Sequence, residues 1–261
     1  MDLTKQQKRE FYNRGYVKVA GAIPKVMIDG ARQAINHSIG TQGPTGEDMG
    51  KNRAATFCRD LHNSPAMSDL YNRSPVLSLA ESLLGEGNLQ KPIKSVQVPP
   101  RFPNVMGEDP PEPRGHLDGM GSGTNGMPKG VYRRGFTVFG VIYLCDVPEP
   151  YSGNYTVWPG SHRFFEDYLN REGLETLSNG TPRVDLPEKP DMITGQAGDL
   201  ILAHHQVLHG PCVNASPNIR YAAIARLRHI DCEKNGNDGF TDIWREFPGV
   251  LEVMEEEAEL A

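Results

Sequence analysis

Cysteine is scarce in this chain of 261 residues, and no two cysteines lie close together. The four cysteines are Cys58, Cys145, Cys212 and Cys232, so no pair has the short spacing typical of zinc clusters. Cysteines this few and this scattered do not form the dense disulfide framework of small secreted proteins. We therefore expect free thiols and a reducing compartment, most simply the cytoplasm.

Long apolar runs and an excess of positive charge are also lacking. The longest apolar run, residues 136–145, has ten residues, whereas a helix needs about 20 to cross a bilayer. The polar N-terminal segment MDLTKQQKRE lacks the features of a signal peptide. The formal net charge of −6 gives no sign of a nucleic-acid-binding surface. We therefore expect neither a membrane nor a nucleic acid as a partner.

The first third of the chain has the pattern of helices. No internal repeat or low-complexity linker divides the sequence, which predicts a single domain. Gly15 is placed to end one amphipathic helix, and Pro24 is placed in the first turn of the next, where proline is tolerated. The expected elements are helices over residues 4–15, 24–39 and 74–87 and a short strand over residues 16–20.

After Leu89 the sequence changes to short segments rich in β-branched and aromatic residues, separated by Gly, Pro, Asn and Asp. The expected strands lie within residues 93–100, 134–147, 153–158, 199–210 and 220–230. Helices followed by many short strands predict a mainly β protein with flanking helices, in which N-terminal helices pack on one sheet of a sandwich or jelly roll. The expected parts are helical support over residues 1–89, a core over residues 90–230 and a helical tail over residues 231–261.

Residues 115–119 read GHLDG, which places His116 and Asp118 one residue apart between glycines. On their own, these two residues are as typical of a hydrogen-bonded loop as of a metal site. Side chains at i and i+2 of an extended chain project to the same side, so both can reach one ion. His209 follows after ninety residues, and two imidazoles with one carboxylate form the facial triad of non-haem iron(II) oxygenases. We therefore predict that His116, Asp118 and His209 are the catalytic metal ligands.

Arg220 follows His209 after ten further residues. Its planar guanidinium suits bidentate binding of a carboxylate, so we predict that it holds the far carboxylate of an oxoacid that chelates the metal. His205 shares a face of the expected strand with His209, and His204 points the other way. Both histidines remain alternatives as the third ligand, although the spacing to Arg220 favours His209.

Two further residues are weaker candidates for cofactor binding. Gln97 lies on the expected strand before the GHLDG segment, and Trp158 ends the segment GNYTVW. We predict that both contact the cofactor, with a buried core amide and a core aromatic residue as the respective alternatives.

The loop over residues 120–134 ends in several cations. Loops that follow catalytic residues often act as lids or binding loops. Lys129, Arg133 and Arg134 are therefore placed to close on an anionic small-molecule substrate. The alternative is a basic edge that only faces solvent.

Five segments together resemble the phytanoyl-CoA dioxygenase family of Fe(II)- and 2-oxoglutarate-dependent oxygenases. They are FYNRGYVKVAGAIPKVMIDGARQAI, ESLLGEGN, HLD, SGNYTVWPGSHRF and GDLILAHHQVLHGPCVNASPNIRYA. The resemblance extends over nearly the whole chain and implies a double-stranded β-helix core, the jelly roll of cupins. It implies that His116, Asp118 and His209 bind Fe(II) and that Arg220 binds 2-oxoglutarate.

The resemblance also implies a reaction. A dioxygenase of this family uses O2 and decarboxylates 2-oxoglutarate to succinate and CO2 while it hydroxylates a C–H bond of a small molecule. The carboxylate of Asp118 disfavours halogenation, because halogenating relatives have a small residue there. Pro211 departs from the serine or alanine that relatives often have. Desaturation, cyclisation or oxidative cleavage of a natural product or phosphonate remains an alternative, as does a metal-binding cupin without oxygenase activity.

Overall fold

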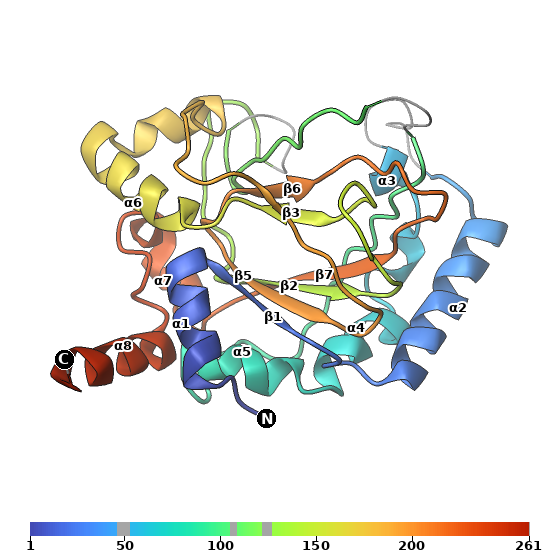
Figure 1. Ribbon diagram of the computed structural model, residues 1–261, viewed down its shortest axis with the longest axis horizontal. Coiled ribbons are helices and arrows are strands. Elements are labelled where there is room, and N and C mark those ends of the chain that lie inside the picture. Colours follow the sequence, from blue (N-terminus) through green and yellow to red (C-terminus); the bar gives the residue numbers. More distant parts are fainter. Residues whose placement is uncertain (46–52, 105–108, 122–126, 261) are drawn as a thin grey trace.

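The computed structural model describes residues 1–45, 53–104, 109–121 and 127–260, and in this part of the chain two antiparallel sheets face each other (Figure 1). The larger sheet has the strand order β1-β5-β2-β7 and the smaller sheet has the order β4-β3-β6. The strands are β1 (Tyr16–Val19), β2 (Val138–Tyr143), β3 (Tyr155–Val157), β4 (Asp191–Met192), β5 (Leu200–His204), β6 (His209–Pro211) and β7 (Ala222–Leu227).

Helices cover the larger sheet on the side away from β3 and β6, where α4 and α5 lie below it in Figure 1. The helices are α1 (Lys5–Arg14), α2 (Lys25–Thr41), α3 (Arg53–Thr56), α4 (Pro65–Asn72), α5 (Val76–Leu84), α6 (Ser161–Glu172), α7 (Cys232–Asn235) and α8 (Pro248–Leu260), with 3-10 turns at Arg59–Leu61, Leu174–Asn179 and Gly236–Phe240. None of the helices in the described ranges is long and apolar enough to cross a membrane.

The expected start and end of the first helix are confirmed. Thr4 and Gln7 form a capping box, in which each side chain accepts a hydrogen bond from the other residue's backbone N–H. Gly15 ends α1 in the left-handed conformation at φ 80°, which costs glycine nothing. The chain therefore turns directly from α1 into β1, an edge strand of the larger sheet.

The two faces of the larger sheet belong to different apolar clusters, as the alternation of side chains along a strand requires. On β2, Val138 and Ile142 pack against the helices, whereas Phe139 and Val141 face the smaller sheet. The Tyr71 hydroxyl, from α4, lies 2.8 Å from the carbonyl oxygen of Gly140 and so ties a helix to the centre of this sheet. The space between the sheets is left for apolar rings and for the residues of the candidate site.

Three expectations about the secondary structure are wrong. The chain is a mixture of helices and antiparallel sheets rather than mainly β, because its strands are short and helices occupy more of the described residues. Residues 199–210 do not form one strand: β5 ends at His204, a turn closes with a hydrogen bond from Val207 N–H to the His204 carbonyl, and β6 begins at His209 in the other sheet. Within residues 93–100, only an isolated bridge at Gln97 pairs with β7.

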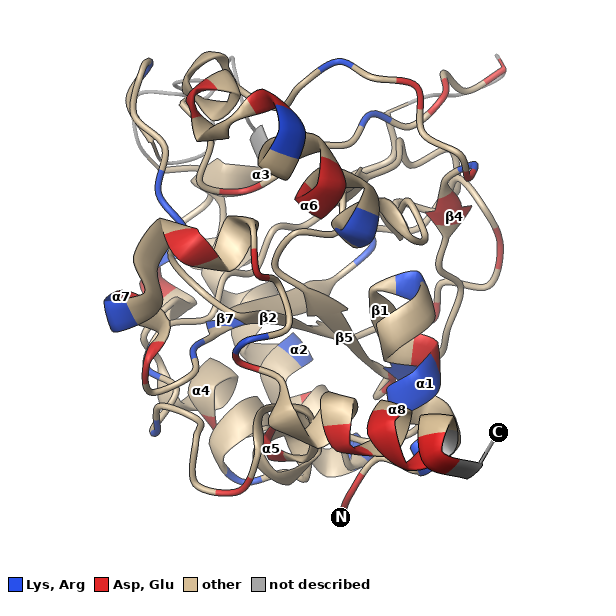
Figure 2. Ribbon diagram, turned by 90° about the vertical axis from the view of Figure 1, so that its left-hand side faces the viewer, with Lys and Arg blue, Asp and Glu red and all other residues tan. Residues whose placement is uncertain are grey.

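The acidic C-terminal segment lies on α8, which packs beside α1 at the helical side of the molecule (Figure 2). Lys5 of α1 forms an ion pair with Glu256 there. Glu252, Glu255, Glu256 and Glu259 are exposed on this helix, away from the space between the two sheets.

Candidate metal centre

The GHLDG segment pairs with the smaller sheet at His116 and then turns at Asp118 and Gly119, with His116 and Leu117 facing opposite sides. His116 pairs with His209 of β6 through two backbone hydrogen bonds of 2.8 and 3.2 Å. Leu117 is buried in a separate apolar cluster, while His116 and Asp118 line the cavity between the sheets. The period of two therefore brings both polar side chains to the same place as His209.

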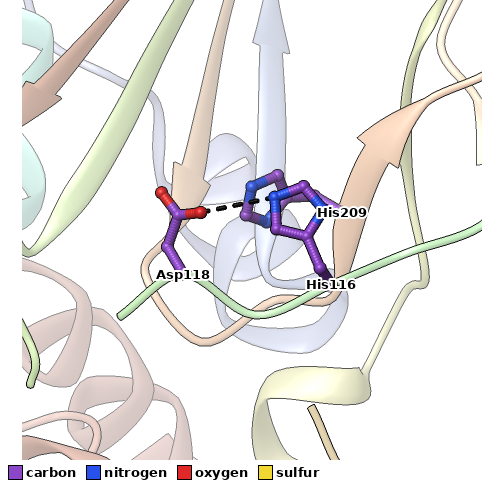
Figure 3. A group of neighbouring side chains, drawn as sticks. All are labelled: His116, Asp118 and His209. Carbon is purple, nitrogen blue, oxygen red and sulfur yellow. Dashed lines mark ion pairs between the residues drawn. The ribbon is translucent and has the colours of Figure 1, made fainter. Parts of the chain in front are cut away.

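His116, Asp118 and His209 converge on one point (Figure 3). One nitrogen of each imidazole and one carboxylate oxygen all lie within 4.8 Å of one another, and in the described ranges no other group of histidine, cysteine and acidic residues is so arranged. His116 Nε2 lies 3.3 Å from Asp118 Oδ1. His209 Nδ1 lies 3.0 Å from the carbonyl oxygen of Val207, which fixes the ring and leaves Nε2 for a metal.

The charge states at this point suit a metal ligand set. Burial alone would raise the pKa of Asp118, but the hydrogen bond with His116 and the charges of His209 and Arg226 hold it well below the usual value. Burial and the neighbouring His116 lower the pKa of His209 to about 4. At neutral pH the aspartate is therefore ionised and His209 is neutral, the forms in which both groups bind metals.

Arg226 holds the second oxygen of the aspartate. Its Nε and Nη2 donate to Asp118 Oδ2 at 2.9 and 2.6 Å, and its Nη1 donates to Gln97 Oε1 at 2.9 Å. The guanidinium also lies over the ring of Phe139, 5.3 Å from its centroid. Because Oδ2 is taken up by Arg226, Asp118 presents only Oδ1 to the point where the histidines meet.

These side chains form part of the wall of a cavity of about 640 Å³. The cavity is open to solvent and combines apolar rings with cations, and Asp118 is its only acidic lining residue among those described. Its cationic lining residues are Arg101, Arg133, Arg220, Arg226 and Arg228. The Tyr155 hydroxyl, also at the wall, is buried and has no hydrogen-bond partner. A cavity of this kind suits a small anionic ligand that accepts hydrogen bonds.

The structure brings together most of the residues that the sequence singles out. Arg220 and Gln97 line the cavity with the three candidate ligands. Trp158 does not: it follows the last residue of β3 and packs against Leu208 and Phe165 in a separate apolar cluster. Trp158 therefore does not lie at the cavity wall, whereas Tyr155, at the other end of the same short strand, does.

The other histidines of the 204–209 segment lie outside the candidate centre. His204 stacks on Phe247, with ring centroids 4.8 Å apart, and His205 Nε2 lies 3.1 Å from the Gly239 carbonyl oxygen. His162 completes this buried cluster, 5.4 Å from His204. These rings pack between the larger sheet and the C-terminal segment, so they are no alternative to His209.

The cationic loop is divided in the structure, and part of it, residues 122–126, lies outside the described residues. Arg133 lines the cavity, but Lys129 is exposed and does not. Arg134 is buried and forms an ion pair with Glu246, with further bonds to the carbonyl oxygens of Gly236 and Cys232. The expectation that Arg134 closes on a substrate is therefore wrong, because its guanidinium is fully used inside the fold.

Three arginines at the cavity were missed in the sequence. Arg226 of β7 and Arg228, which follows this strand, line the same cavity as Arg220, which precedes it, since residues at even intervals along an extended chain project to one side. The two-residue period of a strand, counted from Arg220, is the sequence signal that predicts Arg226 and Arg228 at the cavity. No motif in the sequence around Arg101 indicates its position at the cavity, because that position depends on an antiparallel bridge to the distant Arg220.

Comparisons with known proteins identify the fold. No family model matches the chain, and no curated protein matches its sequence. Three solved structures are similar at TM-scores of 0.54 to 0.59 and identities of 15–16%. The first is the non-heme alpha-ketoglutarate-dependent carbocyclase SnoK from nogalamycin biosynthesis, with 16% identity over 86% of this chain and 83% of that chain and a TM-score of 0.56. The second is HygX from Streptomyces hygroscopicus with nickel and 2-oxoglutarate bound, with 15% identity over 88% of each chain and a TM-score of 0.54. The third is EctD from S. alaskensis with 2-oxoglutarate and 5-hydroxyectoine, with 15% identity over 88% of this chain and 77% of that chain and a TM-score of 0.59. This chain therefore shares the fold of these proteins over most of its length.

Proposed function

We propose that this protein is an Fe(II)- and 2-oxoglutarate-dependent dioxygenase that hydroxylates a C–H bond of a small molecule. The observation that carries the proposal is the convergence of His116, Asp118 and His209 within 4.8 Å, in a cavity that also contains Arg220. Three ligands on one side of an ion leave three positions, two for an oxoacid and one for O2. The fold shared with structures that contain 2-oxoglutarate supports the same conclusion.

The residues present fit both groups. Two imidazoles and a carboxylate are the ligand set that non-haem iron(II) accepts, and the carboxylate is already ionised by its surroundings. The buried Tyr155 hydroxyl has no partner in the protein and is free to bind an oxygen of a ligand. When bound, Fe(II) with 2-oxoglutarate would supply the oxidation: O2 gives one oxygen atom to succinate and one to the product, and CO2 is released.

The protein's own residues supply position and surroundings for this reaction. Arg226 fixes the orientation of Asp118 through its second oxygen, and the Val207 carbonyl fixes the ring of His209. Phe136 and Phe139 line the cavity beside these ligands, with the Phe139 ring centroid 4.5 Å from that of His209, and make this part of the wall apolar. The target C–H bond must lie against this apolar part of the wall.

We further propose that the chain belongs to the phytanoyl-CoA dioxygenase family and that its two sheets are the halves of a jelly roll. The five sequence segments that resemble this family and the pair of facing antiparallel sheets support this assignment. Desaturation, cyclisation or oxidative cleavage with the same cofactors is the second candidate, favoured by the similarity to a structure described as a carbocyclase. Substrate position, rather than the ligand set, decides between these outcomes.

The proposed substrate is an anionic small molecule. Five arginines line the cavity, Arg133 and Arg228 among them, whereas Asp118 is the one acidic lining residue in the described ranges. Arg228 also lines an adjoining hollow with Lys94, into which no described acidic residue projects. A carboxylate or phosphate on the substrate would find complementary charge there. Among candidate compounds, an acid should therefore stimulate turnover more than its neutral methyl ester.

Succinate formation tests the proposed activity. Protein loaded with Fe(II) and supplied with 2-oxoglutarate and O2 should form succinate even without its substrate, slowly, and Asp118→Ala should lower this rate by about 100-fold or more. Tight metal binding with no consumption of 2-oxoglutarate would instead support a metal-binding cupin without oxygenase activity.

A further inference from the structure

Two arginines form one wall of the cavity side by side. Arg101 and Arg220 are paired across an antiparallel bridge, with backbone N–O distances of 2.9 and 3.0 Å in the two directions. Side chains of residues paired in this way project to the same face, and both arginines line the cavity. Gly153 packs between them, since a Cβ there would lie 3.0 Å from Arg101 Cβ and 3.2 Å from Arg220 Cβ.

Neither cation has a partner of opposite charge among the described residues. Arg220 is only 4% exposed, and the buried Nε of Arg101 makes no hydrogen bond. Burial and the charge of Arg220 lower the pKa of Arg101 to about 10, so both side chains still carry a positive charge at neutral pH. Two like charges side by side, one on a buried arginine and one on a half-buried arginine, are unfavourable unless an anion lies between them. The pair is therefore built to receive an anionic group from outside the protein.

The two guanidinium groups differ in how many of their N–H groups are not used in hydrogen bonds within the protein. Arg220 donates from Nε to the Gly153 carbonyl at 2.7 Å and from Nη1 to the Pro99 carbonyl at 3.3 Å. These bonds fix Arg220 and occupy two of its three nitrogens. The side chain of Arg101 donates no hydrogen bond to any described residue, so its whole planar fork is available for a carboxylate.

We propose that Arg101, together with Arg220, binds the distal carboxylate of 2-oxoglutarate. This assignment rests on the proposed function. Arg101 supplies the bidentate pair of N–H groups, and the fixed Arg220 adds the donors that its bonds to Gly153 and Pro99 leave free. Two cations that face the distal carboxylate also make this end of the cavity selective for 2-oxoglutarate over an oxoacid that has a methyl group instead of the distal carboxylate.

Binding of two matched oxoacids to Ni(II)-loaded protein tests the assignment. The two ligands are 2-oxoglutarate and 2-oxopentanoate, which has a methyl group where 2-oxoglutarate has its distal carboxylate. Calorimetric titration should give a Kd for 2-oxoglutarate that is raised about 10- to 100-fold in Arg101→Ala, the effect of losing charge-assisted hydrogen bonds. The Kd for 2-oxopentanoate should change by less than about twofold, because that ligand makes no such bond. Arg101→Lys should recover part of the loss by restoring the charge without the fork.

Arg73→Ala is the matched control, because Arg73 is an exposed arginine that does not line the cavity, and the Kd of this variant for 2-oxoglutarate should stay near that of the wild type. An unchanged Kd for 2-oxoglutarate in Arg101→Ala would overturn the assignment while leaving the proposed function intact. An equal loss for both oxoacids would also overturn it, since it would mean general damage to the cavity. Failure of the wild-type protein to bind 2-oxoglutarate would overturn the proposed function and the assignment with it.

Discussion

At the scale of single residues, two of the three candidate ligands are fixed by a side-chain contact that leaves one atom for the metal. His209 is fixed through Nδ1, Asp118 through Oδ2, and His116 through its backbone pairing with β6. Such outer contacts determine which atom of a ligand faces the ion and how precisely it does so. The site is therefore formed by the folded protein before any ion binds.

Loss of one ligand should remove most of the metal affinity. In His116→Ala the Kd for Ni(II) should rise by more than about 100-fold, because a three-ligand site becomes a two-ligand site. His62→Ala is the control, since His62 also lines the cavity but lies outside the converging group. Equal metal affinity in both variants, measured by calorimetry, would rule out the candidate ligand set.

Gly153 makes the pairing of the two arginines possible. It has φ 72°, and an added Cβ would contact the Cβ atoms of Arg101 and Arg220 at 3.0 and 3.2 Å. Gly153→Ala should lower the free energy of unfolding by about 2–4 kcal/mol, from backbone strain and overpacking combined. Gly43→Ala, at φ 62° with no atom within 4 Å, should cost only about 1 kcal/mol. Urea unfolding of both variants measures the difference, and equal losses would contradict the close packing at Gly153.

At the scale of elements, a buried ion pair joins the entry to β2 with the segment between α7 and α8. Arg134 and Glu246 are 2% and 1% exposed in their side chains. Thr137 and Asn235 also donate hydrogen bonds to the Glu246 carboxylate. These bonds position Arg134 and Thr137, directly before β2 in the larger sheet.

Removal of one partner of this pair should be costly. Glu246→Ala leaves the Arg134 guanidinium buried and without its counter-charge, and should lower the free energy of unfolding by about 3–5 kcal/mol. The double variant Arg134→Met/Glu246→Leu should be closer to the wild type, because it leaves no buried charge unpaired. Urea unfolding gives both values. A double variant as unstable as Glu246→Ala would contradict this account of the pair.

The elements also differ in how far the sequence predicts them. Helix α1 and the start of α2 follow from local signals, the capping box at Thr4, Gly15 and Pro24. The break between β5 and β6 has no such signal, because it arises where the chain crosses from one sheet to the other. For the same reason the sequence predicted His116, Asp118 and His209 as a group by spacing, but gave no indication of Arg101, whose place is set by a bridge across the sheet.

At the scale of the whole molecule, stability should depend on three histidines that are buried in the neutral form. Burial lowers the pKa of His162 to about 3 and holds the pKa values of His204 and His205 well below the usual value. Above pH 6.5 these rings are neutral in both the folded and the unfolded chain and contribute no pH dependence. Below pH 6.5 the unfolded chain takes up protons that the folded chain does not, so acid favours unfolding.

The free energy of unfolding should therefore fall as the pH decreases from 6.5 towards 4, by up to about 1.4 kcal/mol per pH unit for each histidine. His162→Gln should make this dependence shallower, whereas His37→Gln, at an exposed position on α2, should leave it unchanged. Urea unfolding at a series of pH values measures the slope. Identical slopes for His162→Gln and the wild type would contradict the buried neutral state of this ring.

The central claim is that the three converging side chains and the arginine wall together bind Fe(II) and 2-oxoglutarate. The most direct measurement is an anaerobic titration of the metal-free protein with Fe(II) and then 2-oxoglutarate, followed by visible absorption. The account predicts a weak metal-to-ligand charge-transfer band in the wild type, no band in His116→Ala, and a band that needs much more 2-oxoglutarate in Arg220→Ala. Tight Fe(II) binding by the wild type with no band at any concentration of 2-oxoglutarate would contradict it.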